Sequence, residues 1–229
     1  MKRLIPLCIL VIFVFSTLTL VTDHVVTVFS ESAPLYDRIC VVIDAGHGGE
    51  DGGATSCTGE LESHINLQIA LCLDDLFHLI GIDTEMIRTT DRSVYTAGNT
   101  ISARKLSDLK ERVRIINSTE NAILISIHQN TFSESEYRGA QVFYSTKGEG
   151  EDLAEKMQHA FVTALNPGSN RKAKRADNVY LMEHIECTGV LVECGFISNP
   201  EEAVLLNTSQ YQNNVCAVIA STVSTFLYT

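Results

Sequence analysis

The sequence has 229 residues, of which 45% are hydrophobic, and it carries a formal net charge of −11. This apolar content can build the core of one ordinary domain and excludes an intrinsically disordered chain. The acidic charge argues against nucleic acid as a partner, because phosphate backbones are bound by basic surfaces.

The beginning of the chain has the layout of an export signal. Lys2 and Arg3 precede an uncharged run, residues 4–22, that is rich in Leu, Ile, Val and Phe. Such a layout is typical of a secretory signal peptide or a signal anchor. The run is close to the roughly 20 residues that span a bilayer, and no clean small-residue cleavage site follows it. We therefore interpret residues 1–33 as a signal peptide or a signal anchor with its linker, and we expect the protein to be exported.

Strand and helix patterns alternate through residues 38–229. Short β-branched runs predict strands, and apolar residues three or four positions apart predict helices. The predicted strands begin near residue 38 and then cover residues 83–88, 121–127, 139–145, 178–182 and 189–194. The predicted helices cover residues 61–79, 102–117, 151–165 and 209–227. This alternation is typical of an α/β fold, and we expect a single domain with a mostly parallel twisted sheet of about six strands and helices on both faces.

The cysteines do not suggest a thiolate metal site. Seven are scattered along the chain without a CxxC pair of the kind that builds such sites. Most lie in apolar stretches, so we interpret them as small core residues. Whether any two form a disulfide stays open.

Four polar residues are predicted to meet at one edge of the sheet. His47 follows the first strand within the glycine-dense stretch VVIDAGHGGEDGG, residues 41–53, and His128 follows the apolar run AILISI. Glu62 opens the first helix, and Glu193 follows the apolar run VLV. In parallel sheets, sites lie beyond the carboxyl ends of the strands.

These residue types predict a zinc hydrolase. Two histidines and one carboxylate commonly hold zinc and leave a fourth position for water. We expect His47, Glu62 and His128 to bind Zn²⁺, and we prefer Glu62 to Glu60 because it leads directly into the helix. Glu193 is expected to act as a general base that takes a proton from water and gives it to a leaving amine. The reaction class that fits is hydrolysis of an amide.

Neighbouring polar residues are predicted to support this site. Asn66 lies one helical turn after Glu62 and is expected to brace it. Asp44 is expected to steady the glycine turn, because a fourth protein ligand would close the position that water needs. Arg88 and Arg112 are expected to be salt-bridged supports for the end of the sheet.

Four ordered motifs resemble those of a known family. They read DAGHGGEDGGA, GELESHINL, ISIHQN and VLVECGFISNPEEA. In this order and spacing, about residues 39–228 resemble the zinc-dependent N-acetylmuramoyl-L-alanine amidases of the amidase-3 family. The resemblance implies zinc binding by His47, Glu62 and His128, and a catalytic role for Glu193. It also implies cleavage of the bond between N-acetylmuramic acid and L-alanine in peptidoglycan.

A finer resemblance points to spore formation. The stretches ISARKLSDLKERVRIIN, RGAQVFYS and RKAKRADNVYL resemble the germination-specific amidases of spore-forming bacteria. This implies action on the spore cortex, in the forespore intermembrane space or cell wall, with a deacetylase converting the product towards muramic-δ-lactam. The enzyme would be secreted, or anchored in the membrane through residues 4–22. Regulation would come from export timing, metal loading or an activating protein partner, and the glycines of residues 46–53 are expected to leave room for a peptidoglycan strand.

Two other functions, and the role of one charged segment, stay open. The chain could be a zinc peptidase that acts on wall peptides, or a non-catalytic peptidoglycan-binding regulator. The basic residues Arg171, Lys172, Lys174 and Arg175 form either a solvated loop or one side of the groove. In the second case they would meet the carboxylates of stem peptides or dock a protein partner.

Overall fold

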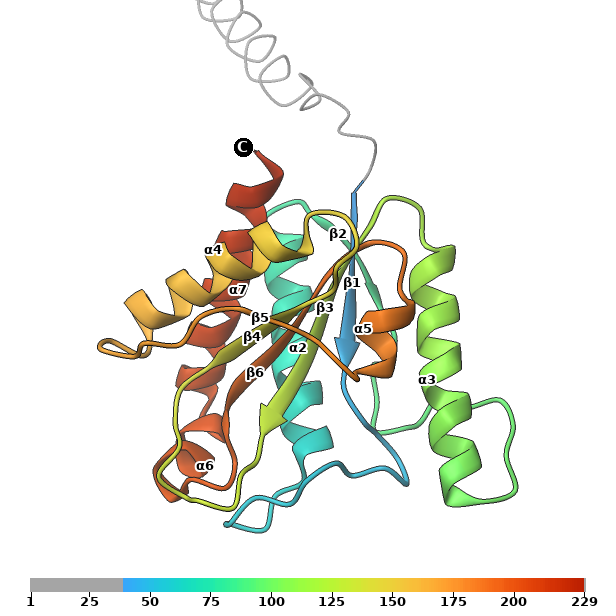
Figure 1. The fold of residues 1–229 in the computed structure, drawn as a ribbon, viewed down its shortest axis with the longest axis horizontal. Helices are drawn as coiled ribbons and strands as arrows, with labels where there is room; N and C mark the ends of the chain where they lie inside the picture. The colour runs from blue at the N-terminus through green and yellow to red at the C-terminus, as the bar shows by residue number, and fades with distance from the viewer. Residues whose placement is uncertain (1–38, 229) are drawn as a thin grey trace, which may run out of the picture. The chain divides into compact units, whose positions relative to one another are not determined.

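A sheet of six strands forms the centre of the fold (Figure 1). The structure is a computed structural model that describes residues 39–228, so the predicted leader, residues 1–33, lies outside the described residues. In chain order the strands are β1 (Cys40–Ala45), β2 (Asp83–Met86), β3 (Ala122–Asn130), β4 (Gln141–Tyr144), β5 (Lys174–Arg175) and β6 (Thr188–Phe196). They are arranged in the order β2-β1-β3-β6-β4-β5, and every neighbouring pair is parallel except β4 with β6. The prediction of a mostly parallel sheet is confirmed.

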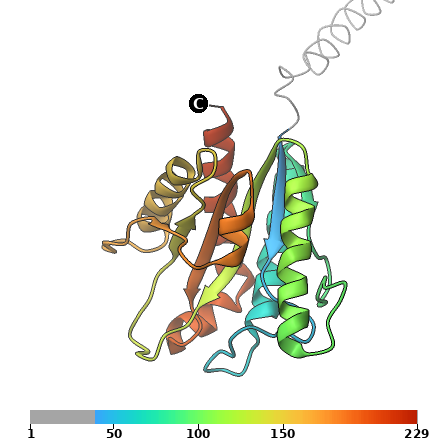
Figure 2. The same ribbon diagram turned by 45° about the vertical axis from the view of Figure 1, so that its right-hand side comes forward.

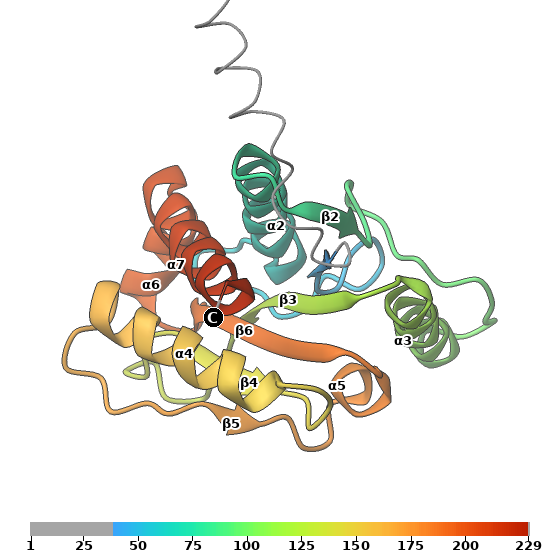
Figure 3. The same ribbon diagram turned by 90° about the horizontal axis from the view of Figure 1, so that it is seen from above.

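Helices cover both faces of this sheet, as predicted (Figure 3). They are α2 (Glu62–Leu79), α3 (Ile101–Ser118), α4 (Gly150–Ala164), α5 (Tyr180–His184), α6 (Pro200–Leu206) and α7 (Ser209–Leu227). One core cluster joins the sheet to α2, α4 and α7, and a smaller one joins it to α3 and α5. Figure 2 shows α3 running alongside β1 on the second face. None of the helices in residues 39–228 has the length and apolarity needed to cross a bilayer.

The central strands are apolar on both sides because both sides are covered. In β1, Val41 and Ile43 belong to the larger core cluster, whereas Val42 belongs to the smaller one. In β3, Ile125 belongs to the larger cluster and Leu124 to the smaller one. Alternate side chains of a strand point to opposite faces, so a strand with two covered faces reads as a continuous apolar run. This is why the sequence pattern identified these strands.

The segment before β6 differs from the prediction. Residues 178–182 were expected to form a strand, but residues 180–184 form the single-turn helix α5, and the adjoining strand β5 lies earlier, at residues 174–175. Helix α5 buries Leu181 and Met182 against the sheet. A short apolar run fits either a strand or a buried helical turn, so periodicity alone could not decide.

Helix α6 was not predicted, although its start has a clear signal. The side chain of Asn199 accepts hydrogen bonds from the backbone N–H groups of Glu201 and Glu202, and Pro200 occupies the first turn. Asparagine followed by proline is a favourable helix start.

The described cysteines are all unpaired. Cys194 and Cys216 lie in the core as predicted, whereas Cys57 is exposed. The interpretation as core residues is therefore correct for only part of the set.

Candidate active site

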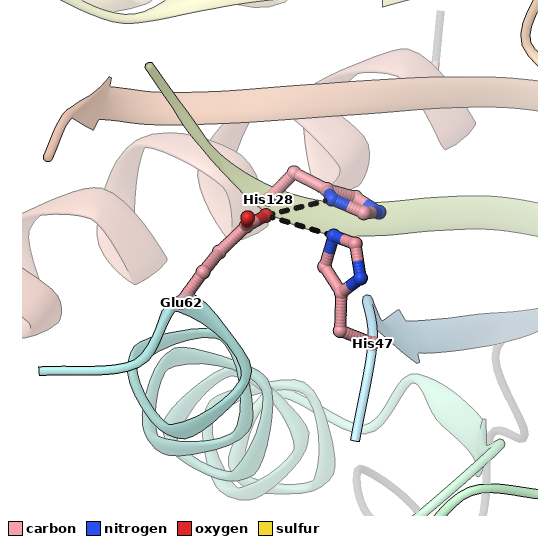
Figure 4. A group of neighbouring side chains, drawn as sticks. All are labelled: His47, Glu62 and His128. Carbon is pink, nitrogen blue, oxygen red and sulfur yellow. Dashed lines mark hydrogen bonds and ion pairs between the residues drawn. The ribbon is translucent and has the colours of Figure 1, made fainter. Parts of the chain in front are cut away.

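The fold brings together the three predicted ligands. His47 follows β1, Glu62 is the first residue of α2, and His128 lies near the end of β3. One ligand atom from each lies within 4.8 Å of the others. Nε2 of His47 is 3.4 Å, and Nδ1 of His128 is 3.0 Å, from the same oxygen, Oε1 of Glu62 (Figure 4). Glu60, the competing carboxylate, is exposed and lies outside this group.

The charges in this group favour a bound cation. Burial alone would raise the pKa of Glu62, but hydrogen bonds and charges from His128 and His47 hold it well below its usual range. Burial lowers the pKa of His47, but the bonds to Glu62 and Asp51 outweigh this effect and raise it to about 9. A buried carboxylate that stays ionised and draws positive charge onto a neighbouring imidazole marks a place where a cation is stabilised. Two imidazoles and one carboxylate are a donor set that fits Zn²⁺.

Asn66 braces the carboxylate of Glu62, as predicted. Its side-chain amide donates to Oε1 of Glu62 at 3.4 Å and to the carbonyl of Gly46 at 3.1 Å. Glu62 also accepts from the backbone N–H groups of Ala54 and Gln129 at 3.0 and 3.2 Å. These bonds fix the carboxylate from several directions.

Asp51 orients His47, a role that was not predicted from the sequence. Nδ1 of His47 lies 2.9 Å from Oδ2 of Asp51, which leaves Nε2 facing Glu62. Lys105 at the start of α3 holds the other oxygen of Asp51 at 2.8 Å. A carboxylate on the second ring nitrogen is typical of metal-binding histidines. The available signal was an acidic residue four positions after His47 in the same glycine-dense stretch.

The glycines of this stretch make room for the ligands themselves. A Cβ on Gly46 would lie 2.7 Å from Cδ2 of His128 and closer still to two other atoms of that ring. A Cβ on Gly53 would lie 2.6 Å from Oε2 of Glu62 and 2.8 Å from Cδ2 of His47. The expected role of these two glycines, clearance for a peptidoglycan strand, therefore needs correction, because protein side chains fill the space.

A buried ion pair holds the end of β1. Arg112 of α3 pairs with Asp44 and with Asp108, and it donates to the carbonyl of His47 at 2.7 Å. Asp44 also accepts from the hydroxyl of Ser126 at 2.7 Å. Burial would raise the pKa of Asp44, but the charge of Arg112 and these hydrogen bonds hold it below its usual range. Both oxygens of Asp44 are thus engaged away from the ligand group, which agrees with its expected supporting role.

Arg88 supports the same turn without an ion pair. It is fully buried, and its guanidinium donates to the carbonyls of Ala45, Gly46, Ser63 and Thr90 at 2.8 to 3.1 Å. Among the described residues it makes no salt bridge, so that part of the prediction is wrong. Its role is to join the end of β1 to the start of α2, which places His47 beside Glu62.

Glu193 lies next to His128 on the neighbouring strand. The two residues are register partners in the β3–β6 pair, and the register then shifts, so that Asn130 pairs with Phe196. This irregularity is a β-bulge, a feature that re-aims side chains beside active sites. Burial raises the pKa of Glu193 to about 7, and Oε2 is buried without a hydrogen-bond partner in the structure. A carboxylate with a raised pKa beside a cation site is suited to accept a proton.

The remaining histidines of the described chain lie outside this group. His64 is half-buried and faces Asp91 at 3.3 Å, and His78 lies 3.1 Å from the hydroxyl of Thr84. His184 stacks on Tyr180. These contacts give each of the three a partner away from the proposed metal ligands.

Comparisons with known proteins point in one direction. The family model described as N-acetylmuramoyl-L-alanine amidase (Amidase_3) matches residues 41–225. The germination-specific N-acetylmuramoyl-L-alanine amidase of Bacillus subtilis is 39% identical over 82% of this chain and 79% of its own length. The CwlD amidase of Clostridioides difficile, solved in complex with the GerS lipoprotein, has a TM-score of 0.79 and 33% identity and covers 83% of this chain and 98% of that one. The catalytic domain of the amidase CwlV from Bacillus (Paenibacillus) polymyxa has a TM-score of 0.71 and 26% identity and covers 83% and 98%.

Proposed function

We propose that this chain, which belongs to the Amidase_3 family of N-acetylmuramoyl-L-alanine amidases, is an exported zinc-dependent member that acts on spore-cortex peptidoglycan. The observation that carries the zinc proposal is the convergence of His47, Glu62 and His128 within 4.8 Å, beside the unpartnered carboxylate oxygen of Glu193. The bond cleaved by the family joins N-acetylmuramic acid to L-alanine.

Each residue has a defined part in this proposal. His47, Glu62 and His128 would hold the zinc ion, and Asp51 and Asn66 would keep two of these ligands in place. When bound, zinc polarises a scissile carbonyl and lowers the pKa of water towards about 7.

Glu193 would transfer a proton from water to the leaving group. Its free Oε2 atom is placed to accept a proton from the attacking water and to pass it to the nitrogen of the leaving L-alanine. General acid–base catalysis of this kind contributes about 10²- to 10⁴-fold in rate. Burial raises the pKa of Glu193, which makes it a stronger proton acceptor than an ordinary carboxylate.

The cortex assignment is supported by similarity to the germination-specific amidase of Bacillus subtilis. In that setting the product would be a muramic acid freed of its stem peptide, which a deacetylase would convert towards muramic-δ-lactam. The export proposal is supported by the sequence of residues 1–33 and by the cell-wall substrate of the family. The similar CwlD amidase was solved in complex with the GerS lipoprotein, which supports the proposal that a protein partner also binds this chain.

The test uses the purified protein with purified cortex peptidoglycan. With added zinc, mass spectrometry of the digest should show muropeptides that have lost the whole stem peptide, and a chelator should abolish this loss. Glu193→Gln should reduce the rate by about 100-fold or more while the bound zinc stays unchanged. The exposed carboxylate Glu186 offers a matched control, and Glu186→Gln should be fully active. Full activity of Glu193→Gln would refute the proton-transfer role, and cuts between amino acids would show a peptidase instead.

A further inference from the structure

A fixed and unpaired guanidinium lies near the proposed active site. The protein carries a net charge of −11, yet Arg171, Lys172, Lys174 and Arg175 follow one another closely. Arg175 is neutralised by Asp177 at 2.5 Å. Arg171 has no carboxylate partner among residues 39–228. Within an acidic protein, an arginine without a counter-charge is a candidate anion site.

The side chain of Arg171 is held in one position. Its Nε atom donates to the carbonyl of Arg138 at 3.1 Å, and Nη1 lies 3.5 Å from the side-chain oxygen of Gln141. Its Cζ atom lies 4.9 Å from the centre of the Phe196 ring, which is 4% exposed. A guanidinium over an aromatic ring gains cation–π energy and loses little entropy when it then binds a ligand.

The nearby carboxylate that could compete for Arg171 is already engaged. Glu202 accepts from the backbone N–H groups of Gly139 and Phe196, each at 2.8 Å. Each of its oxygens thus has a backbone donor, and Glu202 makes no ion pair with Arg171. Burial raises the pKa of Glu202, and the positive charge of Arg171, which acts on it from farther away, partly offsets this rise. Arg171 therefore keeps donor capacity for a ligand.

The contacts of Arg171 place it beside β4 and β6, the strand that carries Glu193. Gln141 is the register partner of Glu193 in the β4–β6 pair, and Phe196 lies three residues after Glu193 on β6. An extended peptide advances about 3.3–3.6 Å per residue. A carboxylate two or three residues beyond the scissile amide would thus lie about 7–11 Å from it, which suits a group held one strand away from β6.

Aromatic side chains line the same part of the surface. Tyr137 stacks on Phe196 with ring centres 6.1 Å apart, and Phe132 contacts Tyr137 at 4.8 Å. Phe132 and Tyr137 are 53% and 43% exposed. Exposed aromatic rings beside a free guanidinium suit a peptide that carries both aliphatic and carboxylate groups.

We propose that Arg171 binds a carboxylate of the stem peptide and so selects substrates whose peptide is acidic. This inference rests on the proposed function, because the proposed amidase site defines where the stem peptide begins. The planar guanidinium offers paired N–H donors that match a carboxylate. Since the rest of the protein is acidic, this local contact must overcome the protein's overall negative electrostatic potential, which repels an acidic peptide.

The experiment compares two soluble muropeptides that differ in one feature: the peptide carboxylates are free in one and converted to carboxamides in the other. The zinc-loaded full-length protein should prefer the free form in kcat/KM by about 10- to 100-fold, as expected for a hydrogen-bonded charge pair. Arg171→Gln should remove this preference mainly through KM, and it should slow hydrolysis of the carboxamide form far less than that of the free form. Arg171→Lys should keep part of it.

Controls separate this contact from general charge and from misfolding. Lys172→Gln removes the same charge from an exposed neighbouring side chain and should keep the full preference. Thermal unfolding and zinc content should be the same for all variants. An unchanged preference in Arg171→Gln, or an equal loss in Lys172→Gln, would overturn the proposal while both substrates are still cleaved, so the amidase assignment would stand. If the wild-type protein cleaves neither substrate, the proposed function fails, and calorimetric binding of the same two muropeptides still decides the role of Arg171.

Discussion

Gly46→Ala is the sharpest test of how the turn after β1 builds the site. Gly46 does not have a positive φ, so alanine is compatible with its backbone, and the effect of the substitution is purely steric. The new Cβ would lie 2.7 Å from Cδ2 of His128 and closer to the rest of the ring. To restore an ordinary contact of about 3.5 Å, the imidazole must withdraw by about 1 Å.

A shift of this size should disable the enzyme without unfolding it. A misplacement of about 1 Å at a reacting centre costs on the order of 100-fold in rate. Local overpacking of this kind also costs about 1–3 kcal/mol of stability. We therefore expect Gly46→Ala to bind zinc more weakly and to release stem peptides about 100-fold more slowly, with a folded circular dichroism spectrum.

Gly52→Ala is the matched control in the same turn. Its Cβ would meet only the flexible side chain of Leu61, at 3.2 Å, so activity should stay close to that of the wild type. Zinc content and release of stem peptides should be measured for both variants side by side. Wild-type activity and zinc affinity in Gly46→Ala would show that His128 does not need the position seen in the structure, and the steric reasoning would be refuted.

Two further predictions concern the supports of the site. In a denaturation experiment, Asp44→Asn should lower the free energy of unfolding by about 3 kcal/mol, because it leaves the buried charge of Arg112 with one partner fewer. As a control, Asp152→Asn breaks an exposed ion pair and should lower the same free energy by less than about 1 kcal/mol. The pKa of Asp44 is lowered in the folded state, so its contribution to the free energy of unfolding is complete above the unfolded pKa of about 3.9 and is lost as the pH falls through the lower folded pKa. The stability difference between Asp44→Asn and wild type should therefore shrink in acid. A difference that does not depend on pH would contradict this. Asp51→Asn should weaken zinc binding about 10- to 100-fold in a competition with a chelating dye, because His47 loses the carboxylate that orients it, and an unchanged affinity would exclude that role.

The sequence was most informative where local pattern and burial agree. Strands β1, β3 and β6 are covered on both faces, so their apolar runs were unmistakable, and the residues at their carboxyl ends could be predicted to meet. Glu62 could be preferred to Glu60 because the helical pattern begins beside it. From these two features the sequence alone predicts that His47, Glu62, His128 and Glu193 lie together.

The sequence was less informative where the outcome depends on how loops pack. The ion pair between Lys105 and Asp51 joins α3 to the glycine turn. The two residues are far apart in the sequence, so no local motif could predict that they pair. The position of Arg171 over Phe196 depends on a loop that returns beside β4. Helix α5 and strand β5 are so short that tertiary packing, and not propensity, decides their form.

The order of the strands has a consequence for how the protein is made. Strand β6 is the last strand in the chain, yet it lies between β3 and β4 in the middle of the sheet. During synthesis, the segments that carry His47 and His128 emerge long before the segment that carries Glu193, and β4 cannot join the sheet until that last segment arrives. Pairings between distant segments form slowly, because the intervening chain must be ordered first. The three proposed ligands can therefore assemble on a partial sheet, whereas the proposed proton acceptor is added only when the chain is almost complete. If these roles are correct, a chain truncated before residue 193 would have no hydrolytic activity.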